Sequence, residues 1–147
     1  MNLPRIMLAA PASGSGKTLI TCGILQALKN RGIKPASFKC GPDYIDPMFH
    51  GKVLGISSKN LDTYFTDEKM TRYLFGREAK DAEISVLEGV MGYYDGLAGS
   101  STKASAYDVA SVTDTPVILV VPARGMIVSV IPLIQGFLNY KIGRAHV

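Results

Sequence analysis

The chain has 147 residues, 47% hydrophobic and 19% charged, with a net charge of +4 at pH 7. This size and composition predict one domain with a buried core and exclude a disordered chain. The basic residues are spread along the sequence. That distribution argues against a nucleic-acid surface and favours small anionic substrates.

The cysteine content and the apolar stretches predict a cytoplasmic location. Two cysteines, Cys22 and Cys40, are too few for a disulfide framework. We expect no membrane span, because Ser129 and Pro132 interrupt the most apolar late stretch, residues 126–134.

A glycine-rich turn, PASGSGKT at residues 11–18, separates the first predicted strand from the first predicted helix. Residues 6–10 are short and apolar, as in a buried parallel strand, and apolar residues recur at helical spacing over residues 17–30. Glycines let backbone N–H groups turn toward an anion, and a helix N-terminus adds partial positive charge. We therefore predict an ATP phosphate site formed by Ser13, Gly14, Ser15, Gly16, Lys17 and Thr18.

This turn differs from the usual P-loop pattern, G-x-x-x-x-G-K-[ST], at Pro11, where the pattern has glycine. In a P-loop, Lys17 reaches the β- and γ-phosphates and the Thr18 hydroxyl binds Mg²⁺. The alternative is a turn that binds nothing. Its place between a strand and a helix favours the phosphate site.

A second cluster of reactive side chains follows the next predicted strand, residues 34–39. The loop at residues 40–50 carries Asp43 and Asp46 beside Lys39. Three residues discourage a regular helix in it: Gly41, Pro42 and Pro47. Each residue taken alone has a structural alternative, since Asp46 could cap a short turn and Tyr44 could pack ordinarily. Their density favours a functional site.

Two further predictions concern this loop and the next strand that ends on an acid. We expect His50 to be structural, because the sequence shows no partner for it. Residues 83–88 predict an apolar strand that ends on Glu88. In a P-loop protein such an acid binds Mg²⁺ or orients water, although it could also be an ordinary surface acid.

The remaining segments complete an α/β prediction. Residues 57–66 are expected to be an irregular connector, with Thr66 capping a helix over residues 67–77. The loop after Glu88 has Tyr93, Tyr94 and Asp95 at its centre and could close over a ligand or remain a solvent turn. A short helix is expected at residues 105–112, and a strand at residues 116–121.

The last predicted helix covers residues 123–140 and is kinked or shortened by Pro132. Its expected buried side is Val130, Ile131, Ile134, Phe137 and Leu138. Together these elements predict a three-layer, Rossmann-like P-loop domain with a mostly parallel sheet of four strands.

We expect residues 142–147, IGRAHV, to be a non-native tail, because they correspond to a translated sequencing-adapter string. The alternative is a genuine short tail. We therefore expect the natural protein sequence in this chain to stop at about Lys141. The domain would then be truncated on its C-terminal side.

Four stretches make the sequence resemble the cobyrinic acid a,c-diamide synthase family. They are PASGSGKT at residues 11–18, KCGPDYIDPMFH at 39–50, EGVMGYYDG at 88–96 and SSTKASAYDVA at 100–110. The amidoligase domain of this family is related to dethiobiotin synthetase and to the MinD/ParA-type ATPases. Residues 1–141 would then be the N-terminal part of an ATP-binding amidoligase domain.

The resemblance implies ATP- and glutamine-dependent amidation of the a and c carboxylates of cobyrinic acid through an acyl phosphate. It implies a Mg²⁺ shell of Thr18, Asp43 and Glu88, and a role for Lys39 in steadying the transferring phosphoryl group. Asp46 and Asp95 would take part in catalysis or metal positioning. Substrate selection would involve Tyr44, Tyr94 and Ser101.

The expected partners are a corrinoid acid, ammonia from a glutaminase domain that this sequence does not contain, and a second copy in a homodimer. No nucleic acid or membrane partner is expected. Hydrogenobyrinic acid and a nickel sirohydrochlorin remain alternative substrates, and cobyric acid synthase is a neighbouring family. A different class, the MinD/ParA-type partitioning or positioning ATPase, is the main alternative. Those proteins usually carry an early P-loop lysine, where this chain has Ala12 and Ser13.

Overall fold

A single parallel sheet organises the protein. The computed structural model describes residues 3–140, so the predicted tail at residues 142–147 lies outside the described part. The strand order is β3-β2-β4-β1-β5, and every neighbouring pair is parallel. The strands are β1 (Arg5–Ala9), β2 (Pro35–Cys40), β3 (Ser58–Leu61), β4 (Ile84–Glu88) and β5 (Val117–Leu119). The predicted α/β P-loop fold class is confirmed.

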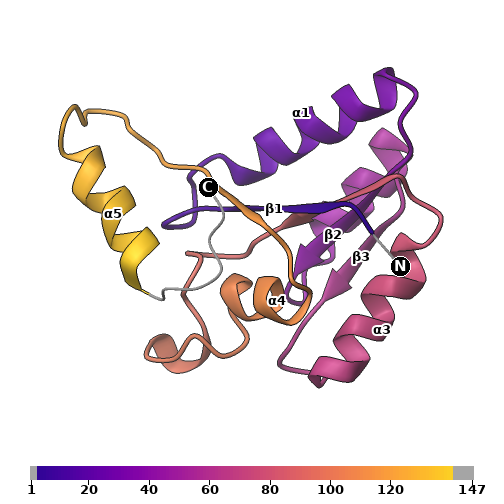
Figure 1. Cartoon of the computed structure of the whole chain (residues 1–147). Helices are drawn as coiled ribbons and strands as arrows, with labels where there is room; N and C mark the ends of the chain where they lie inside the picture. The colour runs from indigo at the N-terminus through magenta and orange to yellow at the C-terminus, as the bar shows by residue number, and fades with distance from the viewer. Residues whose placement is uncertain (1–2, 141–147) are drawn as a thin grey trace.

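Helices cover both faces of this sheet (Figure 1). They are α1 (Lys17–Asn30), α2 (Ile45–Phe49), α3 (Glu68–Ala79), α4 (Ala106–Val112) and α5 (Val130–Tyr140), with a π-helical turn η1 (His50–Leu54) and a 3₁₀ turn η2 (Leu97–Gly99). Helix α1 lies on one face with η1, and α3 and α4 lie on the other. The three layers follow from the two apolar faces of a parallel sheet.

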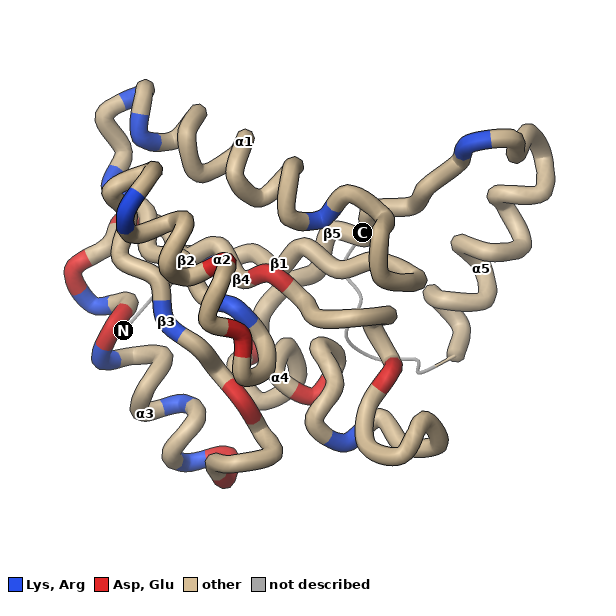
Figure 2. Tube along the Cα trace, turned by 180° about the vertical axis from the view of Figure 1, so that it is seen from behind, with Lys and Arg blue, Asp and Glu red and all other residues tan. Residues whose placement is uncertain are grey.

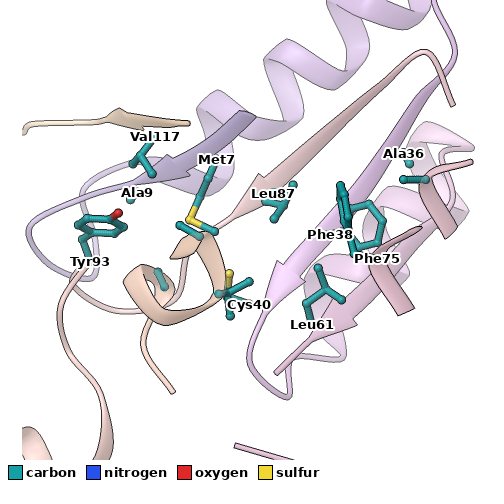
Figure 3. Packing of buried hydrophobic residues seen from close by; sticks show 14 residues of the cluster. Met7, Ala9, Ala36, Phe38, Cys40, Leu61, Phe75, Leu87, Tyr93 and Val117 are labelled. Carbon is teal, nitrogen blue, oxygen red and sulfur yellow. The ribbon is translucent and has the colours of Figure 1, made fainter. Parts of the chain in front are cut away.

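Alternate strand residues supply two hydrophobic cores, and Figure 3 shows the one on the α3/α4 face. On the α3/α4 face, Met7 of β1 and Phe38 of β2 belong to the same buried cluster as Phe75 of α3. The Phe38 and Phe75 rings lie 5.2 Å apart. On the α1 face, Leu8 packs in a second cluster with Leu25 of α1. Successive strand residues point to opposite faces, so Met7 and Leu8 serve different cores.

The prediction of an irregular connector at residues 57–66 was wrong in part, because β3 occupies Ser58–Leu61 and makes a fifth strand. Its sequence, SKNL, is too polar for the apolar pattern of a buried strand. Pairing with β2 stabilises it nonetheless, in the register Lys39 with Asn60. The sheet therefore has five strands rather than four.

The loop at residues 40–50 is also more regular than predicted. It contains α2, with Pro47 inside it. Proline is tolerated there because the first-turn N–H groups of a helix have no intrahelical acceptor. The helix α3 is capped by Asp67, which accepts a hydrogen bond from Met70 N at 2.8 Å, and not by Thr66. The Thr66 hydroxyl donates instead to Asp62 O.

The C-terminal segment departs most from prediction. Strand β5 is limited to Val117–Leu119, and α5 begins at Val130, so Pro132 lies in its first turn. No residue of α5 is buried, contrary to the predicted buried side. The reason is that α5 stands away from the sheet (Figure 1) and packs through Phe137 on Tyr94. Within residues 3–140, no helix has the length and apolar character needed to cross a membrane.

Candidate functional site

The turn between β1 and α1 has the backbone of a phosphate-binding loop. Gly14 and Gly16 have φ values of 74° and 86°, in the left-handed region that other residues rarely adopt. Lys17 follows at the start of α1 and is 7% exposed. Its Nζ donates hydrogen bonds to Ala12 O at 3.1 Å and to Met91 O at 2.8 Å. Burial lowers the pKa of Lys17, and the neighbouring Lys39 charge lowers it further.

Strands β2 and β4 bring a buried lysine and several carboxylates together. Lys39 and Glu88 are register partners on these neighbouring strands. The Lys39 Nζ lies 2.8 Å from Glu88 Oε1, 2.6 Å from Asp46 Oδ2 and 3.8 Å from Asp43 Oδ2. Burial alone would lower the pKa of Lys39, but hydrogen bonds to Asp46 and Glu88 outweigh it and raise that pKa. Figure 2 shows acidic and basic positions close to one another near α2 and β4.

Glu88 connects this cluster to the phosphate loop. The Thr18 hydroxyl donates to Glu88 Oε1 at 2.5 Å. Glu88 is fully buried, and its Oε2 has no hydrogen-bond partner among the described residues. A buried carboxylate oxygen without a donor fits a cation, and Thr18 supplies a second oxygen of the kind that Mg²⁺ prefers. Within residues 3–140, no group of three His, Cys, Asp or Glu side chains converges as a metal site.

Asp43 lies beside the cluster and organises the turn into α2. Its Oδ1 accepts hydrogen bonds from Ile45 N at 2.9 Å and Asp46 N at 3.3 Å. Its backbone carbonyl accepts a hydrogen bond from Asn60 Nδ2 at 2.7 Å. Sequence reasoning missed Asn60, because it lies in the segment interpreted as a connector. The only sequence signal for a role of Asn60 was its amide side chain, directly before Leu61, the last residue of β3.

One pocket of about 430 Å³ gathers all of the predicted nucleotide and metal residues. Its lining includes Ser13, Gly14, Ser15, Gly16, Lys17, Thr18, Lys39, Asp43 and Glu88, with Met91 from the following loop. Asp46 joins them through its ion pair with Lys39. The pocket therefore has the cationic groups and N–H donors for phosphate and the carboxylates for a metal ion.

The other predicted residues lie apart from this pocket. Tyr94, Asp95 and Ser101 line a separate cavity of about 860 Å³ against α5. Asp95 Oδ2 accepts a hydrogen bond from Gly92 N at 2.9 Å, and Tyr94 OH donates to Phe137 O at 2.9 Å. Tyr44 is 76% exposed and lines neither space. The three predicted substrate residues, Tyr44, Tyr94 and Ser101, thus lie outside the phosphate pocket, whereas the charge of Asp95, predicted to be catalytic, still acts on Lys17.

His50 is fully buried, in keeping with the structural role predicted for it. Its Nδ1 lies 2.9 Å from Ser37 Oγ, and its Nε2 lies 3.5 Å from Cys22 Sγ. These partners come from β2 and α1, far from His50 in sequence, which is why the sequence did not show them. Burial lowers the pKa of His50 and raises the pKa of the Cys22 thiol. Cys22 therefore lacks the thiolate character of a nucleophile.

The family that the chain matches is a nucleotide-binding one, in agreement with the geometry of the phosphate loop. Residues 6–135 match the family model described as the CobQ/CobB/MinD/ParA nucleotide binding domain. The chain is 46% identical over 134 residues to a cobyrinate a,c-diamide synthase of Listeria innocua, covering 90% of this chain and 30% of that protein. A hydrogenobyrinate a,c-diamide synthase of Streptomyces coelicolor is 44% identical over 138 residues, covering 94% of this chain and 28% of that protein.

A third relative extends the similarity. A cobyrinate a,c-diamide synthase of Thermoplasma volcanium is 41% identical over 141 residues, or 96% of this chain and 31% of that protein. The chain thus spans about a third of the length of these relatives.

Proposed function

We propose an amide-forming ligase function for this chain, which belongs to the CobQ/CobB/MinD/ParA nucleotide-binding domain family. In this proposal the chain is the ATP-binding part of a longer enzyme of cobalamin biosynthesis. That enzyme amidates the a and c side-chain carboxylates of cobyrinic acid or a related corrinoid acid. The names of the relatives support the substrate class.

The observation that carries the proposal is that two lysines face one pocket. Lys17 lies at the phosphate loop, and Lys39 lies at the end of β2, held by Glu88 and Asp46. Phosphoryl transfer to a carboxylate needs charge neutralisation and alignment of two anions. A second buried cation beside the P-loop lysine supports transfer to an anionic acceptor.

The reaction has two balanced steps. A substrate carboxylate oxygen attacks the γ-phosphorus of ATP, the bond from that phosphorus to the β,γ-bridging oxygen breaks, and ADP and an acyl phosphate form. Ammonia then attacks the acyl carbon, phosphate leaves with the C–O bonding pair, and an amide remains after loss of a proton. Glutamine is the proposed ammonia source, through a glutaminase domain of the longer enzyme.

The roles proposed for individual residues follow from these steps. The phosphate loop, Ser13 to Thr18, holds the ATP phosphates, and Lys39 steadies the transferring phosphoryl group. Asp46 orients Lys39 through their 2.6 Å ion pair. Asp95 would act with them in catalysis, and the substrate would be selected by three residues: Tyr44, Tyr94 and Ser101.

Mg²⁺ fits the residues at the end of β4, where the buried Glu88 Oε2 has no donor in the described part of the chain. Thr18, Asp43 and Glu88 would hold it. When bound, this ion supplies positive charge that neutralises the phosphates. The protein's own contribution is to fix the oxygens of Thr18 and Glu88 beside the phosphate loop.

The test is ADP release by the complete protein encoded by the gene, with candidate activators added separately. We expect stimulation by cobyrinic or hydrogenobyrinic acid and formation of the diamide with glutamine present. Lys17→Ala should abolish both, while Lys52→Ala, an exposed control on η1, should not. Stimulation by DNA or lipid vesicles, with none by corrinoid acids, would replace the ligase proposal with the MinD/ParA-type switch.

A further inference from the structure

A side chain on the edge strand reaches the loop that carries the acids. Asn60 of β3 is the register partner of Lys39, and Lys39 is in turn the register partner of Glu88. Register partners on parallel strands point to the same face of the sheet. Asn60, Lys39 and Glu88 therefore form one row across three strands, at the carboxyl end of the sheet.

Asn60 uses this position to hold the backbone of the acidic turn. Its Nδ2 donates to Asp43 O at 2.7 Å. Because a carbonyl oxygen only accepts, this contact also fixes which end of the Asn60 side chain is the amide nitrogen. The Asp43 carboxylate in turn accepts from the N–H groups of Ile45 and Asp46 at the start of α2. One hydrogen bond from β3 thus anchors the turn that delivers Asp46 to Lys39.

The oxygen of the Asn60 side-chain amide differs from the nitrogen in its hydrogen bonding. This atom, Oδ1, is buried and has no hydrogen-bond partner among residues 3–140. An unpaired buried acceptor destabilises a fold. Packing alone does not require an amide side chain at position 60. The hydrogen bond that its Nδ2 donates to Asp43 O accounts for the presence of an amide there.

We infer that Asn60 is a positioning residue of the proposed ligase site: its amide holds the Asp43–Asp46 turn so that the two carboxylates face Lys39, which lines the phosphate pocket. The inference rests on the proposed function for the role of those carboxylates. The placement of the turn itself depends only on the contacts of Asn60. Losing the amide donor releases the turn while Ser13–Thr18 keep their geometry.

Two measurements on the complete protein test the inference. In Asn60→Ala, amide hydrogen exchange of residues 43–49 should become at least about tenfold faster than in the unsubstituted chain, while exchange in α1 stays unchanged. Titration with a fluorescent ATP analogue should show a Mg²⁺ requirement about tenfold higher, with unchanged affinity for the analogue without Mg²⁺. Asn60→Asp, which keeps the shape but lacks the donor, should exchange like Asn60→Ala.

Lys59→Ala is the matched control, because Lys59 is an exposed neighbour on the same strand, and it should change neither quantity. Unchanged exchange of residues 43–49 in Asn60→Ala would overturn the inference, as would a loss of Mg²⁺-free and Mg²⁺-dependent binding in equal proportion. If the complete protein without substitutions shows no Mg²⁺-dependent nucleotide binding, the proposed function fails instead. The exchange measurement then still decides whether Asn60 holds the turn.

Discussion

The Nζ atom of Lys39 lies 2.8 Å from Oε1 of Glu88, which follows it by 49 residues. The two residues are register partners at the carboxyl ends of β2 and β4. Both are buried, at 5% and 0% exposure, so their charges are compensated mainly by one another and by Asp46. The stability of this end of the sheet therefore depends on keeping the cluster complete.

Lys39→Met should strongly destabilise the protein, because it leaves the buried Glu88 carboxylate without its cation. Removing one partner of a buried ion pair typically costs about 3–5 kcal/mol. Adding Glu88→Gln should recover part of this loss, since the neutral amide needs no counter-charge. Urea unfolding of both single variants and the double variant measures the effect. Strict additivity of the two free-energy changes would contradict coupling between the residues.

Lys17→Ala should weaken ATP binding by at least about tenfold without loss of stability. The Lys17 ammonium is buried against two backbone carbonyls, and burial lowers its pKa, so the charge contributes little to folding. Its removal deletes the cation closest to the predicted phosphates. A fluorescent nucleotide titration measures the affinity, with Lys52→Ala as the exposed control. Unchanged affinity in Lys17→Ala would contradict the phosphate site.

Gly92→Ala should disrupt the contact between the phosphate loop and the loop after β4. A Cβ at Gly92 would collide with the Asp95 carboxylate and lie 2.5 Å from Pro11 O. We expect both lower thermal stability and weaker nucleotide binding. Gly23→Ala in α1 is the matched control, because a Cβ there meets nothing within 4 Å. It should be neutral or stabilising by about 0.5–1 kcal/mol, and equal effects at both positions would contradict this packing.

The phosphate-loop residues and the acids Asp43 and Glu88, which the sequence singled out, lie around one pocket, and each could be identified from local signals. Gly14 and Gly16 are adjacent to their strand and helix, and Glu88 ends an apolar strand. The fifth strand was missed because its stability comes from pairing with β2 and not from its own polar residues. The partners of His50 and the anchor of Asp43 were missed for a similar reason. Both arise from tertiary contacts between distant segments, which periodicity does not encode.

The buried imidazole of His50 should make the stability of the protein depend on pH. Burial lowers its pKa below the ordinary 6.5, although Glu88 and Asp46 partly oppose the shift. The unfolded chain therefore binds a proton at a pH where the folded chain does not, and stability falls as pH drops from about 6.5 to the lowered pKa. Urea unfolding at several pH values between 7.5 and 5 measures this loss. His50→Asn, which keeps a hydrogen-bonding group beside Ser37 but does not titrate, should flatten the slope in this range. An unchanged slope in this variant would assign the pH dependence to other groups.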